Sequence, residues 1–163
     1  MSVRQGKSSP ASGQGLADPR PLPPKARRRL PSVAVLPFLD ERPGPPETHL
    51  CEGLAEEILQ GLNRLEGVWT LSRTTSFPHA GNPLTELAAV GRQLSTEVIL
   101  GGALRLQNGG PILHTELLES ATGRQLAHAD RAFDRGNLFA ILEEIIREVG
   151  SALHLKVEVH PHP

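Results

Sequence analysis

The chain has 163 residues and a mass of 17.6 kDa, a length typical of one domain. Hydrophobic residues make up 38% and charged residues 21%, so most of the chain can form a packed core. No apolar run approaches the roughly 18 residues of a membrane span, and the first ten residues lack the apolar core of a secretory signal. The single cysteine excludes a disulfide framework within the chain. We therefore expect a one-domain cytoplasmic protein.

The charge is divided unevenly along the chain. Residues 1–30 carry seven basic side chains and one acidic one, whereas the remaining 133 residues carry 10 basic and 17 acidic ones. An acidic body argues against nucleic-acid binding, which depends on neutralising phosphates. Ten of the 15 prolines fall in the first 46 residues. We predict that residues 1–31 form a disordered Pro/Arg-rich tail, that residues 32–156 fold, and that residues 157–163 form a second tail.

The first half of the folded region predicts two strands and the helix between them. Val33 to Leu36 form a short apolar run between two prolines, which is typical of a strand buried on both faces. A helix is predicted from about Glu47 to Gly67. Val68 to Ser72 then predict the second strand. The helix is indicated by apolar residues at spacings of three and four, namely Cys51, Leu54, Ile58, Leu62 and Leu65.

A second helix and a third strand follow. Asn82 and Pro83 predict the start of the helix, as an N-cap residue followed by proline in the first turn. The third strand begins at Val98, and the Gly101-Gly102 pair in it indicates a bend or close packing.

The last part of the chain predicts a strand ladder and a final helix. Residues 108–110 (Asn-Gly-Gly) predict a primed hairpin turn, and residues 121–123 predict a second turn. Strands are therefore expected at 112–119 and 125–133, and a helix from about Asn137. The element order β-α-β-α-β-β-β-α with right-handed crossovers predicts an α/β sandwich with a mixed five-stranded sheet.

The final helix has two apolar stripes. Leu138, Leu142, Ile145, Val149 and Ala152 form the stripe that we expect to face the sheet. The second stripe consists of Phe139, Ile146 and Leu153, and we predict that it binds a protein partner or a second copy of the chain.

The chemical motifs in the sequence are incomplete. Gly6-Lys7-Ser8 lacks the first glycine of a phosphate-binding loop, and the histidines near the C-terminus lack a fixed geometry for a metal. The adjacent glutamates at 56–57 and 143–144 point in diverging directions on their helices. We expect no metal, no cofactor and no identifiable small-molecule ligand.

One position in the fold favours binding. Ligands of open α/β sheets bind at the carboxyl ends of parallel strands. Here these ends carry Asp40 after the first strand and Arg73, Thr74 and Thr75 after the second. Two interpretations stay open: these side chains bind a ligand, or they satisfy the polar groups of their own loops. An enzyme would need its titratable groups to converge in this Asp40/Arg73 crevice.

Several motifs occur in the order and spacing of a known bacterial domain. They are Val33-Ala34-Val35-Leu36-Pro37-Phe38, Glu52-Gly53-Leu54-Ala55-Glu56-Glu57-Ile58, Val68-Trp69-Thr70-Leu71-Ser72-Arg73-Thr74-Thr75-Ser76-Phe77, Leu87-Ala88-Ala89-Val90-Gly91-Arg92-Gln93-Leu94, Ala121-Thr122-Gly123 and Leu138-Phe139-Ala140-Ile141. Residues 32–155 resemble the TolB N-terminal-like (FlgO-like) domain.

The resemblance implies an anticodon-binding-domain-like α/β fold without catalytic residues. Domains of this kind accompany adenylate or guanylate cyclases, kinases, winged-helix regulators and tetratricopeptide repeats. We therefore expect a non-enzymatic interaction or sensory module of a signalling protein. The alternative is an envelope-associated assembly protein of the same fold, in the periplasm or at the outer membrane.

Overall fold

The computed structural model describes residues 30–153. The predicted tail 157–163 and nearly all of the predicted tail 1–31 therefore lie outside the described residues. Within residues 30–153 no helix combines the length and the apolar character needed to cross a membrane.

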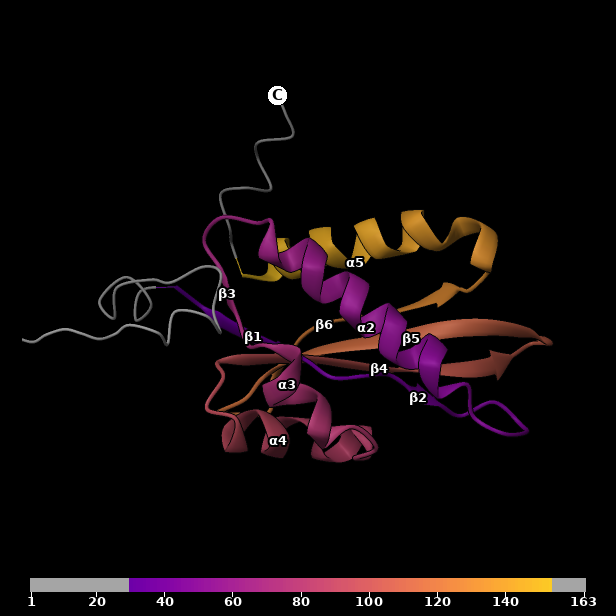
Figure 1. The fold of residues 1–163 in the computed structure, drawn as a ribbon, viewed down its shortest axis with the longest axis horizontal. Coiled ribbons are helices and arrows are strands. Elements are labelled where there is room, and N and C mark those ends of the chain that lie inside the picture. The colour runs from indigo at the N-terminus through magenta and orange to yellow at the C-terminus, as the bar shows by residue number, and fades with distance from the viewer. Residues whose placement is uncertain (1–29, 154–163) are drawn as a thin grey trace, which may run out of the picture.

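The core of the fold is one mixed sheet (Figure 1). Its strands lie in the order β3-β1-β4-β5-β6, where β1 is Ser32–Val35 and β3 is Trp69–Thr70. The long strands are β4 (Val98–Gln107), β5 (Gly110–Glu119) and β6 (Gln125–Ala132). β1 pairs in parallel with β3 and β4, whereas β5 runs antiparallel to both β4 and β6. The predicted α/β class and mixed sheet are confirmed.

A sixth strand, β2 (Leu39–Asp40), corrects the predicted count of five. β2 continues along the edge of β4 that β1 occupies, with Leu39 beside Ala103. Pro37 separates the two strands because it has no N–H to donate to the ladder. The sequence pattern did not show β2 because two residues are too few for a period.

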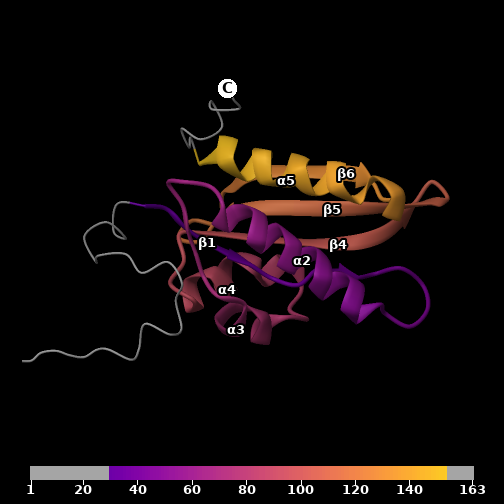
Figure 2. The ribbon, with the colours of Figure 1, turned by 45° about the horizontal axis from the view of Figure 1, so that its top comes forward.

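Helices cover both faces of the sheet (Figures 1 and 2). α2 (Thr48–Asn63) and α5 (Leu138–Ala152) lie on one face, whereas α3 (Arg73–Ser76) and α4 (Leu87–Gln93) lie on the other. The sheet therefore separates two apolar clusters. The larger one joins α2 and α5 to Val33, Leu100 and Leu117, and the smaller one joins α4 to Ala34 and Ile99.

The two predicted helix caps have different outcomes. Asn82 donates its side-chain amide to the carbonyl of His79, and a 3₁₀ turn at Leu84–Glu86 precedes α4. Pro83 has an extended ψ of 152°, so the helical conformation begins only after it. Before α5, Asp134 and Asn137 form a capping box around the 3₁₀ turn Arg135–Asn137. Asp134 is the N-cap of this 3₁₀ turn. Asn137 is the N-cap of α5, as predicted, although its side chain bonds back to Asp134 and makes no cap hydrogen bond to α5.

Glycine is required at two kinds of position. Asn108 and Gly109 have φ angles of 54° and 81°, which confirms the predicted primed turn between β4 and β5. Gly102 lies against the neighbouring backbone, because a Cβ there would be 2.2 Å from the carbonyl oxygen of His114. The close packing predicted for the glycine pair is therefore a contact between β4 and β5.

We predict that Gly102→Ala destabilises the domain by about 1–3 kcal/mol or more, because the added methyl group forces two paired strands apart. Gly110→Ala is the matched control, since a Cβ at Gly110 meets no atom within 4 Å. Urea unfolding followed by circular dichroism measures both changes. Equal stability of the two variants would contradict the close approach at Gly102.

Candidate functional site

Asp40 and Arg73, which we expected in one crevice, have separate partners. Asp40 bonds to Arg42, whereas Arg73 donates to Glu56 at 2.9 Å. In the pairing of β1 with β3, Val33 lies beside Thr70, and continuing this register places Arg73 near Leu36. Leu36 comes four residues before Asp40 in the chain. Four residues of strand span roughly 13 Å. Within residues 30–153 Asp40 and Arg73 therefore act in different contacts.

Asp40 is the centre of a saturated polar cluster. Arg42 donates from Nε to Oδ1 and from Nη2 to Oδ2, each at 2.8 Å, which makes the pair bidentate. The backbone N–H of Glu47 donates to Oδ2 at 2.8 Å, and that of Arg42 to Oδ1 at 3.2 Å. Only 3% of the Asp40 side chain is exposed. Its oxygens are therefore committed to the loop that leads into α2.

The cluster extends across the fold. Glu47 accepts from Arg42 at 3.2 Å and from Arg135 at 2.8 Å, which connects the loop before α2 with the turn before α5. Hydrogen bonds from the Arg42 side chain hold the pKa of Asp40 well below its usual range, and the reciprocal bonds raise the pKa of Arg42. A carboxylate held so firmly in its charged form is suited to a structural clamp and not to proton transfer.

We predict that Asp40→Asn lowers stability at pH 7 by about 1–3 kcal/mol, because Arg42 loses its bidentate pair with a carboxylate and keeps only Glu47 as a charged partner. The folded-state pKa of Asp40 lies below the unfolded value of about 3.9, so the contribution of Asp40 is present above that pH and is lost as the pH falls. The difference between the native chain and Asp40→Asn should therefore shrink from pH 5 to pH 2. Unfolding curves across this range measure it.

Glu41→Gln is the control for that measurement. Glu41 pairs with Arg105 at 2.7 Å, but its side chain is 42% exposed. Its loss should cost less than about 1 kcal/mol. A difference between native chain and Asp40→Asn that stays constant over the whole range would show that Asp40 does not titrate in this way.

Thr74 and Thr75 form part of a local hydroxyl cluster. The hydroxyl of Ser72, just before α3, lies 2.9 Å from that of Thr74 and 3.1 Å from that of Thr75. Arg73 lies 5.1 Å above the ring of Phe77. Arg73, Thr74 and Thr75 therefore make these contacts with residues of α3 and its two ends.

The three residues of the predicted partner surface have different environments. Phe139 is 83% exposed at the start of α5. Ile146 and Leu153 are half-buried and pack against the larger apolar cluster. Ile146 also lies over Gly61 of α2, where a Cβ would be 2.1 Å from Ile146 Cδ1. Of the three, Phe139 alone presents most of its surface to solvent.

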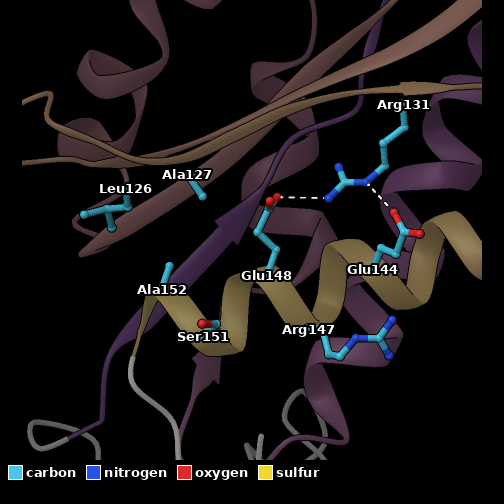
Figure 3. Close-up of a pocket in the computed structure, with 8 residues that line it drawn as sticks. All are labelled: Leu126, Ala127, Arg131, Glu144, Arg147, Glu148, Ser151 and Ala152. Carbon is cyan, nitrogen blue, oxygen red and sulfur yellow. Dashed lines mark hydrogen bonds and ion pairs between the residues drawn. The ribbon is translucent and has the colours of Figure 1, made fainter.

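A groove between β6 and α5 is a feature that the sequence did not reveal (Figure 3). It has a volume of about 630 Å³. Arg131 crosses it and pairs with Glu144 at 3.0 Å and with Glu148 at 3.2 Å. The other lining residues are Leu126, Ala127, Arg147, Ser151 and Ala152. The polar positions 144, 147, 148 and 151 do share one helix face, but only the packing of α5 beside β6 turns that face into a groove wall.

Two other polar groups lie outside the groove. His114 lies 2.6 Å from Asp130 and 2.7 Å from Glu116 on the strand ladder, a bridge that the sequence did not predict. Cys51 is buried, as expected, and burial raises the pKa of its thiol to about 11. Among residues 30–153 no three His, Cys, Asp or Glu side chains are placed to hold a metal ion.

The chain is similar in sequence to part of one curated protein. No family model matches the chain. A curated protein of Rhizobium meliloti (strain 1021), named "Putative adenylate cyclase 3", is 31% identical over 137 residues, which cover 83% of this chain. The same match covers 23% of the Rhizobium protein, so the chain spans less than a quarter of its length.

Solved structures support the fold. TolB from Acinetobacter baumannii matches with a TM-score of 0.57 and 16% identity, over 76% of this chain and 28% of TolB. A hypothetical protein from Chlamydia trachomatis matches with a TM-score of 0.50 and 12% identity, over 76% of this chain and 98% of that one. The chain therefore has the fold of the TolB N-terminal domain, as the sequence motifs indicated, and is a distant homologue of one segment of the cyclase.

Proposed function

We propose that the chain is a non-catalytic interaction or sensory module of a cyclase-type signalling system, and that it acts in the cytoplasm. The observation that carries the proposal is the unequal coverage of the Rhizobium match, 83% of this chain against 23% of the relative. One domain thus corresponds to a segment within a much longer protein. Such a segment is suited to bind, position or regulate the other domains of that protein.

The polar groups at the predicted site support a binding role over a catalytic one. A general acid or base needs a pKa near the working pH and a proton that it can exchange. Asp40 instead keeps its charge far below neutral pH, and its oxygens accept from Arg42 and Glu47. The groove between β6 and α5 offers a space of about 630 Å³ next to the backbone of β6.

We predict that this chain can replace the matching segment of the Rhizobium protein. Deleting that segment should change the rate of cyclic AMP formation by about fivefold or more, as expected for allosteric coupling between domains. Inserting this chain in its place should restore most of the original rate. A Gly/Ser linker of the same length is the control, because it supplies the spacing without the fold.

The isolated chain provides the second arm of the experiment. We expect it to form no cyclic AMP from ATP in the presence of Mg²⁺ or Mn²⁺. Turnover of ATP by this chain would overturn the non-catalytic assignment. If the linker restored the rate as well as this chain does, the segment would be a spacer and the proposed interaction function would be wrong.

A further inference from the structure

β6 ends the sheet and leaves one side of its backbone open among the described residues. The N–H of Phe133 donates to the carbonyl of Pro111 on β5, and bonded pairs alternate along an antiparallel ladder. Ala129 and Arg131 therefore turn their backbone groups toward β5. His128 and Asp130 turn theirs away from β5, so their N–H and C=O groups are available to one further strand.

The groove lies beside this open edge. Arg131 is opposite Leu113 and Ala127 is opposite Leu117, so these β6 side chains point to the α5 face of the sheet. Small or apolar side chains line one end of the groove, at Leu126, Ala127 and Ala152 (Figure 3). A strand added to β6 would direct every second side chain into this space. Its volume of about 630 Å³ is within the range of ligand pockets.

The charges in the groove favour an acidic side chain. Glu144 and Glu148 are both paired with Arg131, whose side chain is 13% exposed. Arg147 lines the same groove and makes no ion pair with the described residues. An incoming carboxylate thus meets one unpaired cation, whereas an incoming cation meets glutamates that already have a partner.

We propose that the β6 edge binds an extended segment of a protein partner, with the pattern acidic-x-apolar, as an added antiparallel strand. The apolar side chain lies against Leu126, Ala127 and Ala152, the acidic one reaches Arg147, and the middle residue bonds to the backbone of His128. Antiparallel pairing is chosen because it is the more stable arrangement per residue. This inference rests on the proposed interaction function and names the surface and the partner chemistry.

A second copy of this chain fits the edge less well. If two β6 strands paired antiparallel about Ala129, Arg131 of the copy would lie opposite Ala127. That register would place a guanidinium at the apolar end of the groove, beside Leu126 and Ala152. Arg131 of the copy would bring its own Glu144 and Glu148 with it, and placing this charged cluster against apolar walls is costly. A partner segment with an apolar residue at this position has no such cost.

The test uses the full chain, labelled with ¹⁵N, and the peptide acetyl-Thr-Glu-Thr-Leu-Thr-Lys-amide. We expect saturable shifts at residues 126–131 and in the last two turns of α5. On binding, the amides of His128 and Asp130 should exchange more slowly with deuterium. Those of Ala129 and Arg131 should change little, because they already face β5. Replacing the middle threonine of the peptide with proline should abolish binding, since proline has no N–H to donate.

A charge swap tests the recognition of the acidic residue. Arg147→Glu should weaken binding of the peptide by about fivefold, a loss expected for a partly exposed ion pair. A peptide with lysine in place of its glutamate should bind Arg147→Glu better than it binds the native chain. This reciprocal rescue excludes an effect of Arg147→Glu on folding.

Several results would overturn the inference. They are the absence of saturable shifts at millimolar peptide, equal binding of the proline peptide, and slow exchange of His128 and Asp130 in the free chain. In the case of slow exchange, sedimentation distinguishes two explanations. A monomer would show that the chain itself covers the edge, and a dimer would show that a second copy covers it. If the peptide fails while the cyclase replacement succeeds, the interaction function stands and only this surface is wrong.

Discussion

The burial of β4 on both faces is the constraint on which the rest of the fold depends. β4 pairs with β1, β2 and β5, and its side chains alternate between the two apolar clusters. Leu100 faces α2 and α5, whereas Ile99 faces α4. From Val98 to Leu104 the strand is buried and carries no polar side chain, and two polar features of the domain, the Asp40 cluster and the groove beside β6, lie at edges of the sheet.

The position of α5 links these two edges. Its start is attached to the loop before α2 through Arg135 and Glu47, and its middle to β6 through Arg131 with Glu144 and Glu148. Between these polar contacts, Ile146 packs over Gly61 of α2. Charged pairs of this exposure contribute little energy each, but together with the apolar stripe they determine where the helix lies. The open groove is a consequence of that position.

Features with a local physical cause could be predicted from the sequence. The apolar run at Val33 requires a doubly buried strand, and Asn108 with Gly109 requires a primed turn; both are present. The position of Asp40 relative to Arg73 depends instead on the register of β1 and β3 and on the pairing of Asp40 with Arg42 in the next loop. Neither feature produces a periodic pattern in the sequence. The contact of Ile146 with Gly61 of α2 cannot be predicted from the apolar stripe of α5 alone, because it depends on how the two helices pack.

An open strand edge exposes a protein to aggregation, and β6 combines protection with accessibility. Natural edges are commonly protected by inward-pointing charges, because a charge that lacks a partner after pairing is costly to bury. Arg131 is such a charge, and Glu144 and Glu148 stabilise it in this protein. Because both glutamates are paired with Arg131, they are not available to a cation on an incoming strand. Among residues 30–153 the same arrangement leaves the outer backbone groups of His128 and Asp130 without a strand partner. The edge therefore discriminates by side-chain chemistry: it disfavours cationic strands such as β6 itself and admits an acidic and apolar one.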